Sequence, residues 1–160
     1  SYYLFGFLFM IITFYLSIKL YTYDNSYLYF LLLMTISIST DIGGYVFGKI
    51  FNGPKLTKIS PNKTYAGAIG GYFLSLISLT IITSYIDYPF LPVQFFITFI
   101  LISTTSQIGD ITVSYFKRKS KIKNTGKIIP GHGGLLDRID GMIFAFPVYY
   151  FFDLLGYRII

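Results

Sequence analysis

QIGDITVSYFKRKSKIKNTGKIIPGHGGLLDRIDG, residues 107–141, is the most polar stretch of a chain that is otherwise overwhelmingly apolar. It combines aspartates, a serine, a run of lysines and arginines, and a glycine-rich turn around the only histidine. Ionisable groups at membrane depth cost free energy and usually serve a function. This stretch is therefore where the sequence predicts a functional site.

The aspartates of this stretch fall into two groups at helical spacing. Gln107, Asp110 and Ser114 share one helix face, and Asp137 and Asp140 share another. A basic loop separates the two groups. Carboxylate oxygens are hard ligands that suit Mg²⁺, so we expect two carboxylate clusters that hold cations against a phosphate.

Composition indicates that the whole chain is a membrane protein. Its 160 residues are 54% hydrophobic and only 12% charged, with a mean hydropathy of +0.62, whereas soluble domains carry about 25% charged residues. The chain has no cysteine, which excludes disulfides and thiol catalysis. We expect one transmembrane domain over residues 1–160.

Five apolar segments are long enough to cross about 30 Å of hydrocarbon as helices. They cover residues 2–20, 27–48, 65–86, 93–116 and 137–155. The predicted fold class is therefore an all-α integral membrane protein, a bundle of about five transmembrane helices.

Charges predict the orientation of this bundle. The net charge is +6, and the loops 49–64 and 117–138 hold eleven of the thirteen lysines and arginines. Five spans put both loops on one face, with Lys19 and Arg158 opposite. Because positive loops face the cytoplasm, we expect the basic loops and the active site on the cytoplasmic side. The same rule explains the charge without nucleic acid, which is not expected as a partner.

Two features outside the polar stretch could also belong to the site. Asp41 lies inside the second apolar segment, where it is either a functional carboxylate or a helix-end residue at the interface. Ser60 and Pro61 predict a helix start, and a helix N-terminus beside Lys63 and Thr64 suits a phosphate. The alternative for this second feature is an ordinary basic loop that ends in a helix cap.

SYFKRKSKIKNTGKIIPGHGGLLDRID, residues 114–140, resembles the signature of the phosphatidate cytidylyltransferases, the CDP-diacylglycerol synthases. The resemblance continues upstream in DIGGYVFGKIFNGPKLTKISPNKT, residues 41–64, and covers roughly residues 41–157. Two positions depart from the family pattern. Asn124 replaces an aspartate, and Ala66 replaces a glutamate or glutamine.

The resemblance implies an enzyme of phospholipid biosynthesis. Members transfer CMP from CTP to phosphatidic acid in the bilayer, giving CDP-diacylglycerol and pyrophosphate. The expected cofactor is Mg²⁺, with a second cation left open, and the expected location is a bacterial inner (cell) membrane. A homodimer is one option for the assembly. Because members of the family are usually longer at the N-terminal end, we expect that the catalytic domain lacks part of its N-terminal region in this chain.

Each role in this reaction is assigned to a group of residues. The residues expected in catalysis are Asp110, Asp137, Ser114, Lys117, Arg118 and Arg138. Those expected to bind substrate are Ser60, Lys63, Thr64, Lys123, Lys127, His132, Gly133 and Gly134. Those expected to hold cations are Asp110 and Asp137, with Asp140 and Asp41 as weaker candidates. His132 is expected to shape the loop or contact phosphate, because an ionised lipid phosphate needs no base.

Two other classes of protein remain open on the sequence. A CTP-dependent lipid kinase would transfer the γ-phosphate to a lipid alcohol with similar parts. A non-catalytic membrane protein, such as a transporter or a decayed remnant of an enzyme, is the second. A transporter would more naturally carry broken helices at the bilayer midplane, whereas the polar groups here collect at one face.

Overall fold

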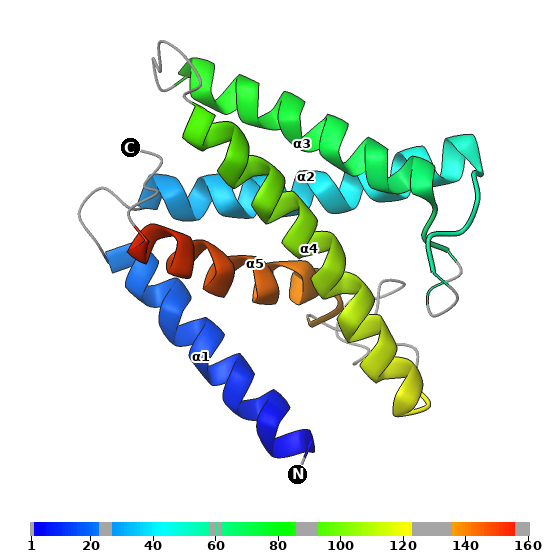
Figure 1. Ribbon diagram of the computed structural model, residues 1–160, viewed down its shortest axis with the longest axis horizontal. Coiled ribbons are helices and arrows are strands. Elements are labelled where there is room, and N and C mark those ends of the chain that lie inside the picture. The colour runs from blue at the N-terminus through cyan, green and yellow to red at the C-terminus, as the bar shows by residue number, and fades with distance from the viewer. Residues whose placement is uncertain are drawn as a thin grey trace.

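The described residues fold into five helices (Figure 1). In this computed structural model the helices are α1 (Tyr2–Thr22), α2 (Tyr27–Phe51), α3 (Tyr65–Tyr85), α4 (Val93–Lys119) and α5 (Leu136–Leu154). The structure describes residues 2–22, 27–57, 60, 62–85, 93–122 and 136–155, and the extended pairing within them is a single bridge between Lys55 and Thr64. The all-α prediction is confirmed, and the predicted segments end within three residues of the observed helices.

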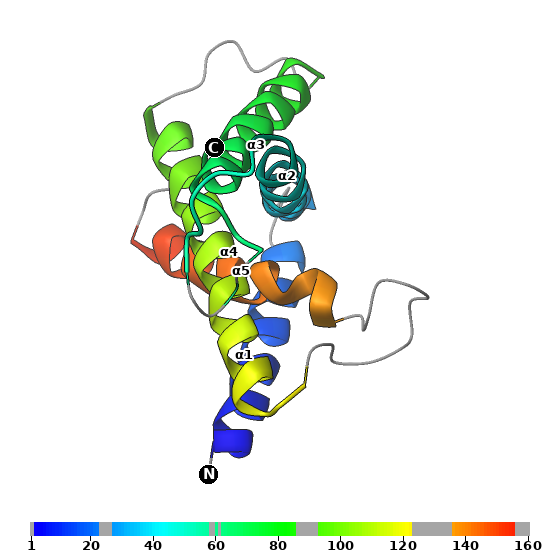
Figure 2. The ribbon, with the colours of Figure 1, turned by 90° about the vertical axis from the view of Figure 1, so that its right-hand side faces the viewer.

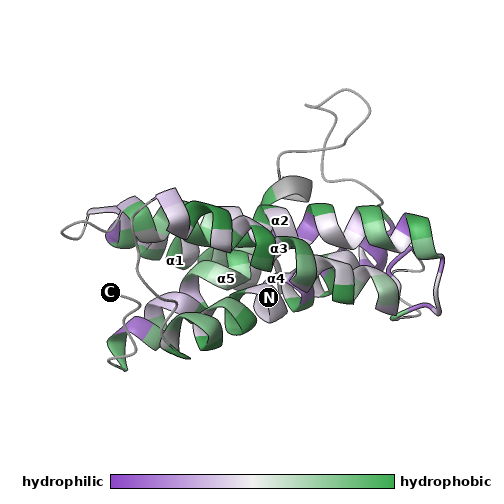
Figure 3. Cartoon of the chain, turned by 90° about the horizontal axis from the view of Figure 1, so that it is seen from above, coloured by the Kyte–Doolittle hydropathy of each residue, from purple (hydrophilic) through white to green (hydrophobic). Residues whose placement is uncertain are grey.

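Three of the helices are long and apolar enough to cross a membrane. They cover Phe30–Phe51, Tyr65–Tyr85 and Phe95–Lys119, and a shorter apolar helix covers Gly6–Thr22. Large apolar side chains also point outward on every helix. Examples are Phe7, Ile42, Ile69, Ile100 and Phe151. Figure 3 shows hydrophobic residues along most of each helix and hydrophilic ones in the connection between α2 and α3 at the right-hand end. Such a surface is typical of a protein that faces lipid.

Successive helices alternate in direction. The last turns of α2 and α4 and the first turns of α3 and α5 therefore lie toward the same side, on the right in Figure 1. This end of the bundle carries the described residues of both predicted basic loops, 52–57, 60 and 62–64 in the first and 117–122 in the second. The fold thus gathers the polar segments at one end, as the count of five helices predicts.

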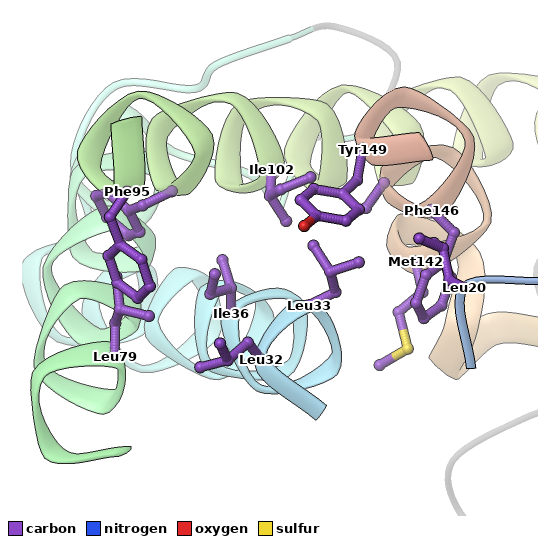
Figure 4. Packing of buried hydrophobic residues seen from close by; sticks show 12 residues of the cluster. Leu20, Leu32, Leu33, Ile36, Leu79, Phe95, Ile102, Met142, Phe146 and Tyr149 are labelled. Carbon is purple, nitrogen blue, oxygen red and sulfur yellow. The ribbon is translucent and has the colours of Figure 1, made fainter. Parts of the chain in front are cut away.

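The apolar core lies where α2, α4 and α5 meet. Figure 4 shows Tyr149 of α5 between Ile102 of α4 and Leu33 of α2, and all three side chains are at most 1% exposed. Phe30 and Phe146 stack with their ring centroids 5.2 Å apart. Between the helices the fully buried residues include small serines, namely Ser37, Ser75, Ser103 and Ser106. Small residues at interfaces are how helices pack closely in lipid, where apolar burial alone gives no preference for a neighbouring helix.

Glycines on facing sides let α2 and α3 pack at very short range, side by side in Figure 2. A Cβ atom at Gly43 would overlap the backbone carbonyl of Gly70, and a Cβ at Gly67 would lie 2.6 Å from the Gly44 carbonyl oxygen. Neither contact can be relieved by moving a side chain, because both partners are backbone. The two helices therefore depend on glycine here to reach their observed separation.

Pro147 interrupts the hydrogen-bond ladder of α5 and explains a contact with α1. Proline has no N–H, so the carbonyl of Ile143 lacks its usual helical donor. The Thr13 hydroxyl lies 3.2 Å from this carbonyl oxygen and 3.0 Å from that of Phe9 in its own helix. A free carbonyl is costly in an apolar medium, so Thr13 both satisfies α5 and ties it to α1.

The substitution Thr13→Val is expected to lower the free energy of unfolding in detergent by about 1 kcal/mol, the net value of one buried hydrogen bond. In a Pro147→Ala background the restored N–H can satisfy Ile143, so the same substitution should cost much less. A double-mutant cycle measured by thermal or denaturant unfolding gives both costs. Equal costs in the two backgrounds would show that Thr13 does not serve the carbonyl freed by the proline.

Candidate active site

Figure 2 shows the connection between α2 and α3 passing across α4. Residues of both segments line a pocket of about 280 Å³. Residues from α2, from this connection, from the start of α3 and from the second half of α4 line it. They are Thr40, Asp41, Gly44, Tyr45, Leu56, Ser60, Asn62, Lys63, Thr64, Gly67, Ala68, Gln107, Asp110, Ile111 and Ser114. The pocket thus combines two carboxylates, a lysine and several hydroxyl groups next to apolar walls.

The connection between α2 and α3 is a compact, hydrogen-bonded turn. It begins after α2 at Asn52, whose φ of 41° is a left-handed conformation that asparagine tolerates at a helix C-terminus. The Leu56 N–H donates to the carbonyl of Lys63 at 2.7 Å, and the Tyr65 N–H donates to that of Pro54 at 3.1 Å. These bonds fold the connection back on itself and fix the backbone of Lys63 above α4.

The predicted helix start at Ser60 and Pro61 is wrong. Helix α3 begins at Tyr65, and the Thr64 hydroxyl accepts the Gly67 N–H at 3.0 Å as its N-cap. Ser60 instead lies in the turn, where its carbonyl accepts the Lys63 N–H at 3.0 Å. The pairing of Lys55 with Thr64 holds the chain extended just before the helix, so the helix cannot start earlier. Ser60 and Thr64 nevertheless both line the pocket.

Lys63 reaches across the pocket to α4, where its ammonium group forms an ion pair with the Asp110 carboxylate. The two side chains are 22% and 30% exposed, so the pair is open to solvent and to ligands. Ser114 lies one helical turn beyond Asp110 and lines the same pocket, as the predicted shared face requires. Asp41 of α2 is also in the lining, so the structure brings the Asp41 and Asp110 of the prediction to one site.

A close crossing of α4 and α5 brings the second group of acids to this end of the bundle. A Cβ at Gly109 would lie 2.7 Å from the Phe144 ring, and one at Gly141 would overlap the Ser106 hydroxyl. Each glycine is the neighbour of an aspartate, Asp110 or Asp140. The absence of a side chain at both positions therefore lets the helices approach where the two carboxylates lie.

Asp140 is paired with a lysine, as Asp110 is, but its carboxylate is buried. Its side chain is 5% exposed, and one carboxylate oxygen accepts a hydrogen bond from the Lys117 ammonium group at 3.3 Å. The other oxygen lies 3.1 Å from the Gly141 N–H. Its charge also interacts with those of Asp110 and Lys63. Two lysines and two aspartates thus form one electrostatic cluster, with Asp140 and Lys117 on its buried side.

Polar contacts between helices support the floor of the pocket. The Gln107 side-chain amide donates to the Ala68 carbonyl at 3.3 Å, which ties α4 to α3. Deeper in the bundle, the hydroxyl groups of Thr40 and Ser103 are 2.9 Å apart and link α2 to α4. Hydrogen bonds across helices hold the three lining helices in register.

Helix α4 ends in a left-handed cap beyond Lys117. Lys121 has a φ of 57°, its N–H donates to the Arg118 carbonyl, and the Ile122 N–H donates to the Lys117 carbonyl, each at 3.0 Å. This pair of bonds is a Schellman motif. Arg118 is exposed at this end.

The predicted site residues divide into four groups. Those that line the pocket are Asp41, Ser60, Lys63, Thr64, Asp110 and Ser114. Those that belong to α4 and α5 but do not line the pocket are Lys117, Arg118 and Asp140. Asp137 and Arg138 belong to the first turn of α5, but their side chains are outside those that the structure describes. The remaining predicted residues lie outside the described residues: Lys123, Lys127, His132, Gly133 and Gly134.

Sequence reasoning missed three polar lining residues, Thr40, Tyr45 and Asn62. Asn62 stands directly before Lys63, which could have signalled it, whereas Tyr45 looks like any tyrosine in an aromatic-rich chain. Of the two departures from the family pattern, Ala66 is outside the pocket lining. It faces Gly53, where an added Cβ would lie 3.4 Å from the Ala66 Cβ. Asn124 is outside the described residues.

The donors of this site suit a hard divalent cation. Asp110, Asp41 and Ser114 offer carboxylate and hydroxyl oxygens in one pocket, the ligand type that Mg²⁺ prefers. Mg²⁺ usually keeps several waters and is held by one or two carboxylates together with substrate phosphates. Within the part of the chain that the structure describes, no three acidic or histidine side chains converge.

Helical membrane proteins with such a pocket, acidic and basic at once, are suited to bind a phosphate-bearing ligand together with a cation. The comparison with known families identifies this one. The model of the cytidylyltransferase family matches residues 1–155, and the chain belongs to that family.

Individual relatives are similar at about the same level. The chain is 39% identical over 121 residues to a phosphatidate cytidylyltransferase of Staphylococcus saprophyticus. The aligned residues cover 75% of this chain and 46% of the relative. It is 40% identical over 124 residues to one of Brucella suis (75% and 44%) and 38% identical over 117 residues to one of Synechocystis sp. (73% and 40%). The chain therefore spans less than half the length of these relatives.

Proposed function

We propose that this chain carries the cytidylyl-transferring site of a phosphatidate cytidylyltransferase. The observation that carries the proposal is the ion pair between Lys63 and Asp110 inside one pocket. It joins residues 41–64, which contain one part of the family resemblance, to α4, which leads into the other part at residues 114–140. Relatives named for this activity support the same function.

The charges of the site suit the chemistry of this reaction. A phosphate oxygen of phosphatidic acid attacks the α-phosphorus of CTP, a new P–O bond forms, and the bond to the β-phosphate breaks to release pyrophosphate. Both reactants are anions, so catalysis consists largely of positioning and charge neutralisation. Lys63, Ser60 and Thr64 line the pocket, where the lysine and the two hydroxyl groups would bind phosphate oxygens.

Carboxylates supply the other half of the site. Asp110, with Asp41 and Ser114 beside it, would hold Mg²⁺, which when bound offsets charge on the triphosphate. Asp137 is expected to share this role, and a second cation remains part of the proposal. Lys117 holds Asp140 in place. The basic residues that follow α4, together with Arg138 and the turn at residues 131–134, are expected to contact the nucleotide or the lipid phosphate.

The proposed setting is a bacterial cell membrane crossed by all five helices. The basic segments 49–64 and 117–138 would face the cytoplasm, where CTP is found, and phosphatidic acid would reach the pocket from the adjoining leaflet. The positive-inside rule supports this orientation. A homodimer stays a prediction.

Single cysteines in this cysteine-free chain test the orientation. Cysteines at Lys55 and Lys121 should react with a membrane-impermeant thiol reagent only after the cells are opened, whereas one at Tyr88 should react in intact cells. The expected difference follows from five alternating spans and cytoplasmic basic loops. Labelling of all three positions in intact cells would reject the topology.

Lys63→Ala is expected to lower kcat/KM for CTP by about ten- to a hundredfold, the value of one charge-assisted hydrogen bond. Folding should be retained, because the backbone bonds of the connection do not involve this side chain. Steady-state kinetics in mixed micelles, with the thermal unfolding temperature as the control, measure both. An unchanged kcat/KM would return this segment to the role of a basic loop that only sets the topology.

The fate of the label in CTP separates this function from its rivals. With CTP labelled at the α-phosphate, the lipid product should become radioactive, and with CTP labelled at the γ-phosphate the label should appear in pyrophosphate. A lipid kinase would instead move the γ-label into a lipid alcohol and leave the α-label in CDP. A chain that moves neither label into either product would be a non-catalytic membrane protein.

A further inference from the structure

The two ion pairs of the site differ in how accessible they are. The side chains of Lys117 and Asp140 are 13% and 5% exposed, whereas those of Lys63 and Asp110 are 22% and 30% exposed and line the pocket. An ion pair that ligands can reach can be exchanged, while a buried one is expensive to break. The ion pair between Lys63 and Asp110 can therefore be exchanged for other partners of either side chain.

We propose that Lys63 is an exchangeable counter-ion of Asp110. It occupies the carboxylate in the ligand-free protein and gives it up to a divalent cation when its ammonium group moves onto a phosphate of the nucleotide. This role rests on the proposed function, because it takes Asp110 as a cation ligand and CTP as the phosphate source.

Competition for one carboxylate follows from simple electrostatics. The Lys63 ammonium contacts the Asp110 carboxylate directly, and a cation bound to the same group would be repelled by a positive charge at contact distance. The backbone of Lys63 is fixed by its bonds to Leu56 and Ser60. The exchange must therefore be a rotation of the long lysine side chain within the pocket, which the volume of about 280 Å³ allows.

The exchange makes the cation and the nucleotide depend on each other. A cation alone must displace Lys63 with no anion to receive it, and a nucleotide alone must take Lys63 from Asp110 and leave the carboxylate uncompensated. When the cation and the nucleotide bind together, Asp110 pairs with the cation and Lys63 pairs with a phosphate, so no charged group is left without a partner. The site should therefore prefer the metal–nucleotide complex to either component, and in their absence the pair removes the cost of an isolated charge near the membrane.

Binding of Mn²⁺ alone to the purified protein, measured by electron paramagnetic resonance without nucleotide, tests the proposal. Lys63→Met keeps the length of the side chain and removes its charge, so it should tighten Mn²⁺ binding by about five- to tenfold, the net effect of an ordinary hydrogen bond, because solvent partly screens this pair. Lys55→Met is the matched control, because it removes the same charge from an exposed position of the same connection. It should change Mn²⁺ affinity by less than about twofold, the scale of screened surface charges.

Two further variants complete the experiment. Lys63→Arg retains the charge and should retain the weak Mn²⁺ binding of the parent protein. Asp110→Asn, introduced into the Lys63→Met protein, should weaken the tight Mn²⁺ binding expected there. Mn²⁺ affinity that is equal in the Lys63→Met and Lys55→Met proteins, or lower in the former, would overturn the proposal. If Lys63→Met does not fold, Lys63→Gln gives the same comparison.

The measurement is independent of the catalytic activity. Tighter Mn²⁺ binding in a chain that transfers no CMP would support the counter-ion role and reject the proposed function. Transfer of CMP with unchanged Mn²⁺ affinity would support the function and reject the counter-ion role.

Discussion

Asp110→Asn and Asp137→Asn are each expected to lower kcat by at least about two orders of magnitude, the loss typical of removing one electrostatic element of catalysis. Asparagine keeps the size of the side chain and one acceptor oxygen but removes the charge that a hard cation prefers. Asp110 lines the pocket on α4, and Asp137 stands in the first turn of α5. Because both would act on one cation cluster, the double variant should be little slower than either single one.

Asp153→Asn is the matched control for this pair. It removes a carboxylate from the last turn of the same helix that carries Asp137, at the opposite end of the bundle in Figure 1. Its kcat should stay within about twofold of the parent protein, because a charge so far from the pocket is screened. Raising the Mg²⁺ concentration should partly rescue the two slow variants. A well-folded Asp110→Asn protein with normal turnover would mean that this carboxylate is structural.

Gly43→Ala is expected to produce the largest loss of stability from a single methyl group, about 3 kcal/mol, the upper end for overpacking. The added Cβ would overlap the backbone of Gly70 and lie 2.9 Å from the Cα of Gly71. Since no side chain can move aside, α2 and α3 must separate. Their separation would also widen the pocket, because Gly44 and Gly67 form part of its wall, so activity should fall with stability.

Gly6→Ala provides the control for the intrinsic effect of the substitution. A Cβ at Gly6 would meet nothing within 4 Å, and alanine favours a helix over glycine by about 1 kcal/mol. This variant should therefore be as stable as the parent protein or slightly more so. Unfolding in a graded detergent series compares the two, and equal stability of Gly43→Ala and Gly6→Ala would mean that the crossing of α2 and α3 tolerates a wider spacing.

The helices were predictable from the sequence because each is a long apolar run between polar breaks. The bounds of α3 at Tyr65 and α4 at Val93 agree with the first residues of the predicted segments. The separate prediction of a helix start at Ser60 and Pro61 is wrong, although a serine before a proline is a good local cap. Tertiary pairing of Lys55 with Thr64 overrides that local preference.

Six of the pocket residues were predicted from the sequence, but helical geometry related only Asp110 and Ser114 to each other. The spacing of Asp110 and Ser114 placed them on one face correctly, since this depends on helical geometry alone. The pairing of Asp110 with Lys63 and of Asp140 with Lys117 depends on which helices cross and at what depth. That depth is set by glycines such as Gly141 at the crossing of α4 and α5, whose effect appears only when both helices are in place.

Release of pyrophosphate from CTP by the purified chain in phosphatidate-containing vesicles tests the proposed activity most directly. We expect release that requires both phosphatidate and Mg²⁺, equals the amount of CMP found in the lipid, and is lost in the Asp110→Asn protein. Catalysis by positioned charges demands all three dependences. Pyrophosphate release that continues without phosphatidate, or none in a folded protein supplied with both substrates and Mg²⁺, would contradict the assignment.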